Sequence, residues 1–183
     1  MKKTIIYLLI ITFISVQFMG CTKGNTNNST KEITSQSTKE NNIEEHTVES
    51  QKSKLYALAF DAVWEMDKGL NSNIKFISIN TKTFKDFSQE DKKQLFDYIA
   101  HKYNVTMLDM SIDELKNEGY VKELNFNEGV LFQVDKYNSY SSNSVSFEGK
   151  KWRSGSGAIG FSFEGKNKNN KWVLKKCNMT WIS

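Results

Sequence analysis

The hydrophobic pattern of this sequence changes its period near residue 129, and that change limits the folds open to the chain. Before it, apolar residues recur at helical spacing in residues 54–68 and 88–102. After it, four segments alternate apolar and polar side chains, as strands do. These segments are residues 130–136, 144–148, 158–166 and 171–182. Because helices come first and antiparallel strands last, the sequence predicts an α+β domain whose N-terminal helices pack on a curved, mainly antiparallel sheet.

Capping residues set the expected ends of the two long helices. Ser53 is the predicted N-cap of the first helix, and Gly69 is its predicted stop. Ser88 and Asp91 have the spacing of a capping box at the start of the second helix.

Shorter elements are expected between the helices and the strand-rich half. Residues 73–81 and 105–110 are apolar enough to form strands. Ser111 is the predicted cap of a brief helix over residues 112–118, which Gly119 ends.

The last hairpin has the clearest pattern in the chain. Asn169 and Asn170 are the predicted turn, since Asn tolerates positive φ better than most residues. Simple alternation divides the final strand between two faces. One face holds Trp172, Leu174 and Ile182, and the other holds Val173, Cys177, Met179 and Trp181.

The element order is similar to that of cystatin-like and nuclear-transport-factor-like folds. That resemblance implies a cone-shaped space between the helix of residues 54–68 and the sheet. It implies nothing about activity, because one fold hosts many functions.

Composition excludes several classes of function. The net charge of +4 is small and the basic residues are not clustered, which argues against a nucleic-acid partner. Two cysteines cannot build a disulfide framework. If the Cys21 thiol carries a lipid, as argued below, two histidines and Cys177 remain, which are too few for a zinc site, and we expect neither a metal nor a cofactor. The domain is expected to be a monomer.

The first twenty residues have the pattern of a secretory signal peptide. Lys2 and Lys3 form a positive start, and an apolar run follows over residues 5–18. A spanning helix needs about 20 apolar residues. This run is shorter, so a cleaved signal over residues 1–20 is predicted in place of a permanent span.

The Gly20-Cys21 junction resembles the lipobox of bacterial lipoproteins. The resemblance implies that a diacylglyceryl group carrying acyl chains such as palmitate is attached to the Cys21 thiol, and that the chain is cut before Cys21. Two acyl chains would hold the protein at the outer face of the cytoplasmic membrane, where one chain binds only reversibly. The alternative is an ordinary signal peptide whose cysteine is incidental.

A polar tether is predicted to separate the anchor from the domain. Residues 22–53 are mostly Thr, Ser, Asn, Gln, Lys and Glu, without an aromatic side chain. Such a segment cannot bury enough apolar surface to offset the entropy of ordering, so it is expected to be disordered. The predicted organisation is a signal peptide (1–20), a lipidated Cys21 with its linker (21–53) and one α+β domain (54–183).

Candidates for catalysis are weak, and no enzymatic activity is predicted. Residues 155–160 fit Gly-x-Gly-x-x-Gly, but a strand follows where a dinucleotide site needs a helix, so a turn is favoured. Cys177 lies on a predicted strand, where thiols are usually inert packing. Asp109, Asp113 and Glu114 surround the start of a short helix, where acids complement the helix dipole.

The best binding candidate is an aromatic and basic group in the strand-rich half. Trp152 and Arg153 follow Tyr137 and Tyr140 along the chain, and Trp, Tyr and Arg are the usual anchors of protein interfaces. Burial of the same side chains in the core is the alternative.

The signal, the polar tether and the ending Trp181-Ile182-Ser183 behind a basic hairpin resemble those of small lipoproteins of low-GC Gram-positive bacteria. The resemblance implies a membrane-anchored, extracytoplasmic, non-enzymatic module that binds an envelope protein or a wall component. Some proteins of this type are labelled as substrate-binding components of peptide transporters. The alternative is therefore a ligand-binding accessory of a transporter for peptides or small molecules. A third hypothesis for the function is an exported hydrolase.

Overall fold

A computed structural model describes residues 48–183 of the chain. The predicted signal peptide, the predicted lipidation site Cys21 and most of the predicted tether lie outside the described residues. The α-helices are α1 (Gln51–Trp64), α2 (Gln89–Tyr103) and α3 (Ile112–Asn117), and the 3-10 turns are η1 (Lys68–Asn71) and η2 (Thr81–Thr83). The strands are β1 (Phe76–Ile79), β2 (Thr106–Leu108), β3 (Gly129–Tyr140), β4 (Ser144–Ser154), β5 (Gly157–Lys168) and β6 (Lys171–Ile182).

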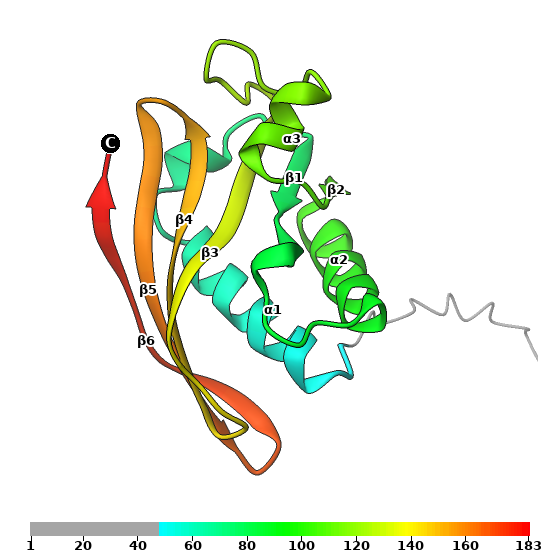
Figure 1. Ribbon diagram of the computed structural model, residues 1–183, viewed down its shortest axis with the longest axis vertical. Coiled ribbons are helices and arrows are strands. Elements are labelled where there is room, and N and C mark those ends of the chain that lie inside the picture. The colour runs from blue at the N-terminus through cyan, green and yellow to red at the C-terminus, as the bar shows by residue number, and fades with distance from the viewer. Residues whose placement is uncertain (1–47) are drawn as a thin grey trace, which may run out of the picture. The chain divides into compact units, whose positions relative to one another are not determined.

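The predicted α+β class is confirmed. The strands form one open six-stranded sheet in the order β2-β1-β3-β4-β5-β6. β1 pairs in parallel with β2 and β3, whereas the four long strands from β3 to β6 form an antiparallel meander. The meander is long and curved, and α1 and α2 lie together along one of its faces (Figure 1).

α1 begins earlier than predicted. Its N-cap is Ser50, whose side chain accepts a hydrogen bond from the backbone N–H of Ser53, so the prediction of Ser53 as the cap is wrong. Ser53 is buried inside the first turn instead, and its hydroxyl donates to the backbone carbonyl of Asp91 at 2.7 Å. The last three residues of the predicted tether, from Gln51, therefore belong to the helix.

α1 also ends before Gly69, the predicted stop. The buried ammonium of Lys151, on β4, donates to the backbone carbonyls of Trp64, Met66 and Asp67 at 2.9–3.3 Å. These carbonyls include orphan acceptors of the helix end, which a side chain can satisfy as well as a glycine cap can. Asp67 takes positive φ (42°) and starts the turn η1.

The predicted capping box of α2 and the predicted Ser111 cap of α3 are confirmed, and the α3 cap is also a full capping box. Ser88 and Asp91 exchange side-chain to backbone hydrogen bonds at the start of α2, as Ser111 and Glu114 do at the start of α3. Gly119, just beyond α3, has the positive φ (79°) expected of a helix-ending glycine.

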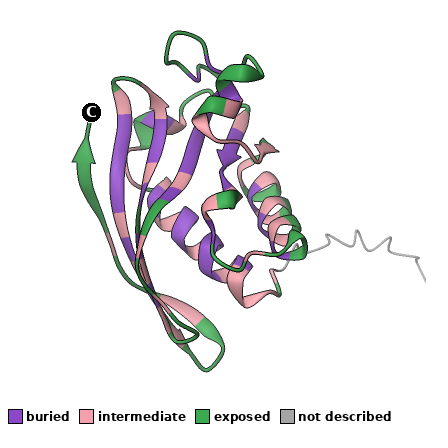
Figure 2. Ribbon diagram, viewed as in Figure 1, coloured by how far each residue is buried: buried purple, intermediate pink, exposed green. Residues whose placement is uncertain are grey.

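The space between α1, α2 and the sheet is filled by side chains. Tyr56 of α1 stacks on Phe84 with ring centroids 3.8 Å apart, and Phe132 stacks on Phe161 at 5.2 Å. Purple, buried segments follow α1 and the middle strands in Figure 2. The cone-shaped space implied by the fold resemblance is therefore packed core in this protein.

A second, smaller core lies on the opposite face of the sheet. Leu131, Trp152 and Ala158 are neighbours across β3, β4 and β5, one residue out of phase with the positions that face α1. Because side chains alternate along strands, these three point away from α1. Leu115 of α3 and Phe126 of the following loop cover them.

The final hairpin follows its prediction at the turn and departs from it along the strand. Asn169 and Asn170 both have positive φ (51° and 59°), as predicted for the turn. Register shifts then interrupt β6 where it pairs with β5, so strict alternation fails. Trp172 and Cys177, predicted on opposite faces, both pack against the main core.

β6 is also the exposed edge of the sheet. Trp181 is 46% exposed and packs over Gly160, where an added Cβ would lie 2.0 Å from the indole Nε1. The last glycine of the Gly-x-Gly-x-x-Gly match thus allows a close side-chain approach, and the match itself spans the β4–β5 turn, as predicted.

Candidate functional site

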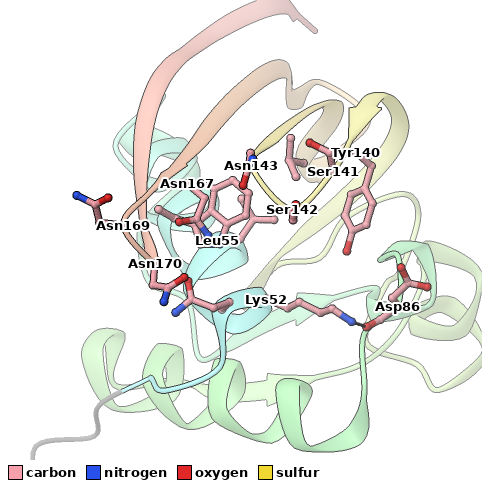
Figure 3. A pocket seen from close by; sticks show the side chains of 13 residues that line it. Lys52, Leu55, Asp86, Tyr140, Ser141, Ser142, Asn143, Asn167, Asn169 and Asn170 are labelled. Carbon is pink, nitrogen blue, oxygen red and sulfur yellow. Dashed lines mark hydrogen bonds between the residues drawn. The ribbon is translucent and has the colours of Figure 1, made fainter.

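The candidate site is a solvent-open groove of about 520 Å³ at one end of the meander. The turn between β3 and β4, the turn between β5 and β6, and the first turn of α1 form its walls (Figure 3). Its volume lies within the range of small-ligand sites, roughly 300–1,000 Å³.

Topology brings these segments together. In an antiparallel meander alternate turns lie at the same end of the sheet, so the β3–β4 and β5–β6 turns are neighbours. The backbone N–H of Asn167 donates to the carbonyl of Asn143 at 2.9 Å and joins the two turns. α1 starts beside them because Ser50 is held by the Asp91 carboxylate of α2.

Polar groups of the groove are mostly neutral. Side-chain amides and hydroxyls make up the rim, from Gln51, Ser141, Ser142, Asn143, Asn167, Asn169 and Asn170. The charged lining residues are Lys52 and Asp86, and the Lys52 ammonium donates to the backbone carbonyl of Asp86. In Figure 3 the Lys52 side chain reaches across to Asp86 beneath Tyr140.

Apolar and aromatic groups complete the lining. Leu55 of α1 and Val145 of β4 are each 1% exposed and supply buried aliphatic surface. Tyr140 of β3 and Trp172 of β6 add partly exposed rings. The groove thus combines an apolar lining with neutral hydrogen-bonding groups.

Two buried polar atoms of groove residues have no partner. The described residues contain four buried side-chain polar atoms without a hydrogen bond, and two of these belong to the groove lining: Gln51 Oε1 and Trp172 Nε1. Leaving such a group unpaired costs about 1–3 kcal/mol. One of the two is an acceptor and the other a donor, and both are shielded from solvent, so a ligand would reach them only where the Gln51 or Trp172 side chain turns towards the groove.

Of the four predicted binding residues, the structure brings Tyr137 and Tyr140 together. Their rings meet edge to face with centroids 5.5 Å apart, and the Lys85 ammonium lies over both rings at 4.9 and 5.5 Å. Tyr137 also hydrogen-bonds the Tyr56 hydroxyl, and burial raises the pKa of both Tyr137 and Tyr140. Tyr140 lines the groove, while Tyr137 lies behind it in contact with the core.

Trp152 and Arg153 do not belong to the same patch. Trp152 is 9% exposed and packs in the smaller core, so burial in the core is the correct reading. The guanidinium of Arg153 donates to the backbone carbonyls of Leu70, Ser72 and Asn127 and braces two loops. Trp152 pairs with Leu131 near the start of β3 and Arg153 follows Trp152, whereas Tyr137 and Tyr140 lie near the end of β3.

Asp109 and Glu114, two of the acidic candidates, have hydrogen-bond and ion-pair partners. Asp109 accepts from the Thr81 hydroxyl and the Lys92 ammonium, at 2.8 and 3.0 Å. Glu114 completes the cap of α3 and pairs with Lys82.

Cys177 is a packing residue, as predicted. It lies against the main core, and burial raises the pKa of its thiol to about 11, so the thiol is protonated at neutral pH.

Sequence reasoning missed most of the groove. Gln51 lay in the predicted tether, Asn169 and Asn170 were interpreted only as a turn, and no role was predicted for residues 141–143. The available signal was topological, because two turns separated by a pair of antiparallel strands must share an end of the sheet.

Within residues 48–183, no three His, Cys, Asp or Glu side chains are grouped so that they could hold a metal ion. No helix in this part of the chain is long and apolar enough to cross a membrane. No family model matches the sequence, and neither curated proteins nor solved structures include a significant match.

Proposed function

We propose that this chain is a lipid-anchored extracytoplasmic protein whose domain binds a component of the cell envelope without chemical turnover. Cys21 would carry the anchor, at the outer face of the cytoplasmic membrane. The observation that carries the binding role is the end groove, where neutral polar groups and aromatic rings surround a 520 Å³ space and two buried polar atoms lack partners.

The chemistry of the groove supports binding over catalysis. Proton transfer or nucleophilic attack needs a positioned titratable group. The titratable side chains lining the groove are Lys52, Asp86 and Tyr140, and both the Lys52 ammonium and the Tyr140 hydroxyl donate to backbone carbonyls of residues 85 and 86. An exported hydrolase is therefore the least supported role.

A ligand-binding accessory of a transporter is the second candidate. The volume of the groove supports it, because 520 Å³ suits a small molecule or a short peptide. Such a role would use the same groove and differ in its companion, which would be a permease subunit in place of a wall component or another envelope protein.

Cross-linking in intact cells of a low-GC Gram-positive host tests the proposal. Ser142→Trp places a large ring on the groove rim, and Ser156→Trp places the same ring on the exposed β4–β5 turn outside the groove. The parent and the Ser156→Trp chain should be cross-linked to the same companion, and Ser142→Trp should lose most of it. Mass spectrometry identifies protein companions, and muramic acid content identifies wall material.

The outcome also separates the two candidates. Wall material or an envelope protein supports the first role, and permease subunits support the transporter accessory. If all three chains give the same companions, or if the parent gives none, the groove is not the site and the proposal fails.

A further inference from the structure

We propose that the groove binds a neutral saccharide. This ligand class rests on the proposed binding function and deepens it. It is argued from four features of the lining: the two unpartnered buried atoms, the amide-rich rim, the aromatic and aliphatic surface, and the balance of one cation and one anion.

A hydroxyl group is the ligand group that best matches the two unpartnered atoms. Gln51 Oε1 can only accept a hydrogen bond, and Trp172 Nε1 can only donate one. A hydroxyl does both at once, since it has one donor hydrogen and two acceptor lone pairs. If the two side chains turn towards a bound ligand, one rich in hydroxyls would pair both atoms, whereas an ion or a purely apolar molecule would leave at least one unpaired.

The rim offers further groups of the same kind. The side-chain amides of Asn143, Asn167 and Asn170 line the groove and form no hydrogen bond with other described residues. Each amide has two donors and one acceptor oxygen, which match the vicinal hydroxyls of a sugar ring. Asn169 also lines the groove, but its side chain points away from the others in Figure 3.

The apolar lining matches the remaining surface of a sugar. A pyranose ring carries C–H groups on its faces, and these pack on the electron-rich faces of aromatic rings. Tyr140 and Trp172 supply such rings, and Leu55 and Val145 supply aliphatic surface. Polar groups at the rim and apolar groups beneath them are the arrangement that an amphipathic ring requires.

Charge and backbone pairing disfavour the competing ligands. The two charged lining residues, Lys52 and Asp86, have opposite signs, so the lining has no excess positive charge to favour a phosphate or carboxylate. An extended peptide is usually held by a free strand edge. Here the two turns are already joined by the Asn167–Asn143 backbone hydrogen bond, and side-chain amides form the rim.

The test uses the indole N–H signals of the full-length chain. The sequence has four tryptophans, so ¹⁵N–¹H spectra should show four indole resonances, and Trp172→Phe assigns the one in the groove. The chain is kept in a zwitterionic detergent, because sugar-headed detergents would compete. The probes are cellotetraose, chitotetraose and tetra-alanine, each titrated into the millimolar range.

We expect at least one tetrasaccharide to shift the Trp172 indole in a saturable way, while the buried Trp152 indole stays still. Gln51→Leu removes the orphan acceptor and should weaken that binding roughly tenfold, which is the loss of about one hydrogen bond. Gln89→Leu, on the exposed start of α2, is the matched control and should bind like the parent.

Three results would contradict the proposal that the groove binds a neutral saccharide. They are no shift with either tetrasaccharide, a shift with tetra-alanine alone, and saccharide binding that Gln51→Leu leaves unchanged. The first two do not decide the binding function itself. If Ser142→Trp still removes the cross-linked companion, the groove binds something other than a neutral sugar. If Ser142→Trp has no effect either, both proposals fail.

Discussion

At the scale of single residues, Lys151 shows how one buried charge can end a helix. Its ammonium satisfies three carbonyls at the end of α1 and lies 5.4 Å from the centroid of the Trp64 ring. Burial lowers the pKa of this lysine to about 8. The sequence around Lys151 does not indicate this role. Lys150 is its neighbour in the chain, and the two lysines differ only in the face of β4 on which each side chain lies.

Replacing Lys151 by Met should therefore destabilise the domain, and the loss should depend on pH. The carbonyls lose their partner, which costs about 1–3 kcal/mol. The lysine also titrates near pH 8 when folded and near 10.5 when unfolded, so between these values the unfolded chain binds more protons. Its contribution to the free energy of unfolding rises with pH in that window, with a slope of up to about 1.4 kcal/mol per unit.

Urea unfolding of the parent and Lys151→Met between pH 7 and 10 measures this contribution. The difference between the two chains is the useful quantity, because burial raises the pKa of Cys177 and the buried tyrosines and gives the parent an opposing trend. The deficit of the variant should widen as pH rises above 8. A deficit that stays constant across the range would show that Lys151 does not titrate as described.

At the scale of elements, helix starts are predictable where their partners are local. The capping box of α2 and the Ser111 cap of α3 were predicted because their partners lie within three residues in the sequence. The start of α1 was missed because a distant residue decides it. Ser50 and Ser53 are both adequate caps by sequence, and the Asp91 carboxylate and carbonyl in α2 select Ser50 as the cap and bury Ser53.

The faces on which the β6 side chains lie, and the set of residues that line the groove, depend on contacts between residues still farther apart in the sequence. Register shifts in β6 put Trp172 and Cys177 on the same side, and the sequence carries no mark of these shifts. The residues of the candidate site were predicted only at Tyr140. Trp152 and Arg153 have the residue types of an interface, but the cover from α3 and the loops they brace makes them structural.

The capping box of α3 gives a prediction for this scale. The Lys82 ammonium, the Ser111 backbone N–H and the Ser111 hydroxyl hold the pKa of Glu114 at about 2, below its usual 4.5. A carboxyl with a lowered folded pKa stabilises the fold above its unfolded pKa, and that stabilisation is lost as pH falls from 4.5 towards 2. Glu114→Gln should therefore lose stability at pH 6 and show a flatter decline on acidification.

Thermal unfolding followed by circular dichroism, from pH 6 to 2.5, checks the effect of Glu114→Gln. Asp113→Asn is the matched control, because it removes a charge from the same helical turn and leaves the hydrogen bonds of the box in place. Equal effects of the two substitutions would mean that the helix dipole, and not the box, is responsible.

At the scale of the whole molecule, the candidate groove lies where two hairpin tips meet the first helix. The core itself is filled, so a ligand of the candidate groove would lie at the end of the sheet and not inside it. This arrangement suits a module that must meet a bulky or immobile partner. A chain end or a ring of a larger polymer can reach an open groove, whereas an enclosed cavity would admit only free small molecules.

The anchor decides whether that groove works at the membrane surface. If Cys21 carries two acyl chains, each buried methylene adds about 0.8 kcal/mol to membrane binding, and the two chains together hold the protein firmly.

Cys21→Ala should move the protein from the membrane fraction to the soluble fraction of cells. Cys177→Ala is the matched control: Cys177 is the other cysteine of the sequence and packs in the folded domain, so its variant should stay with the membrane. Intact-mass spectrometry of the parent should show the added diacylglyceryl group on Cys21. A Cys21→Ala chain that fractionates like the parent would rule out the lipid anchor, while the cross-linking and saccharide tests of the groove would stand unaffected.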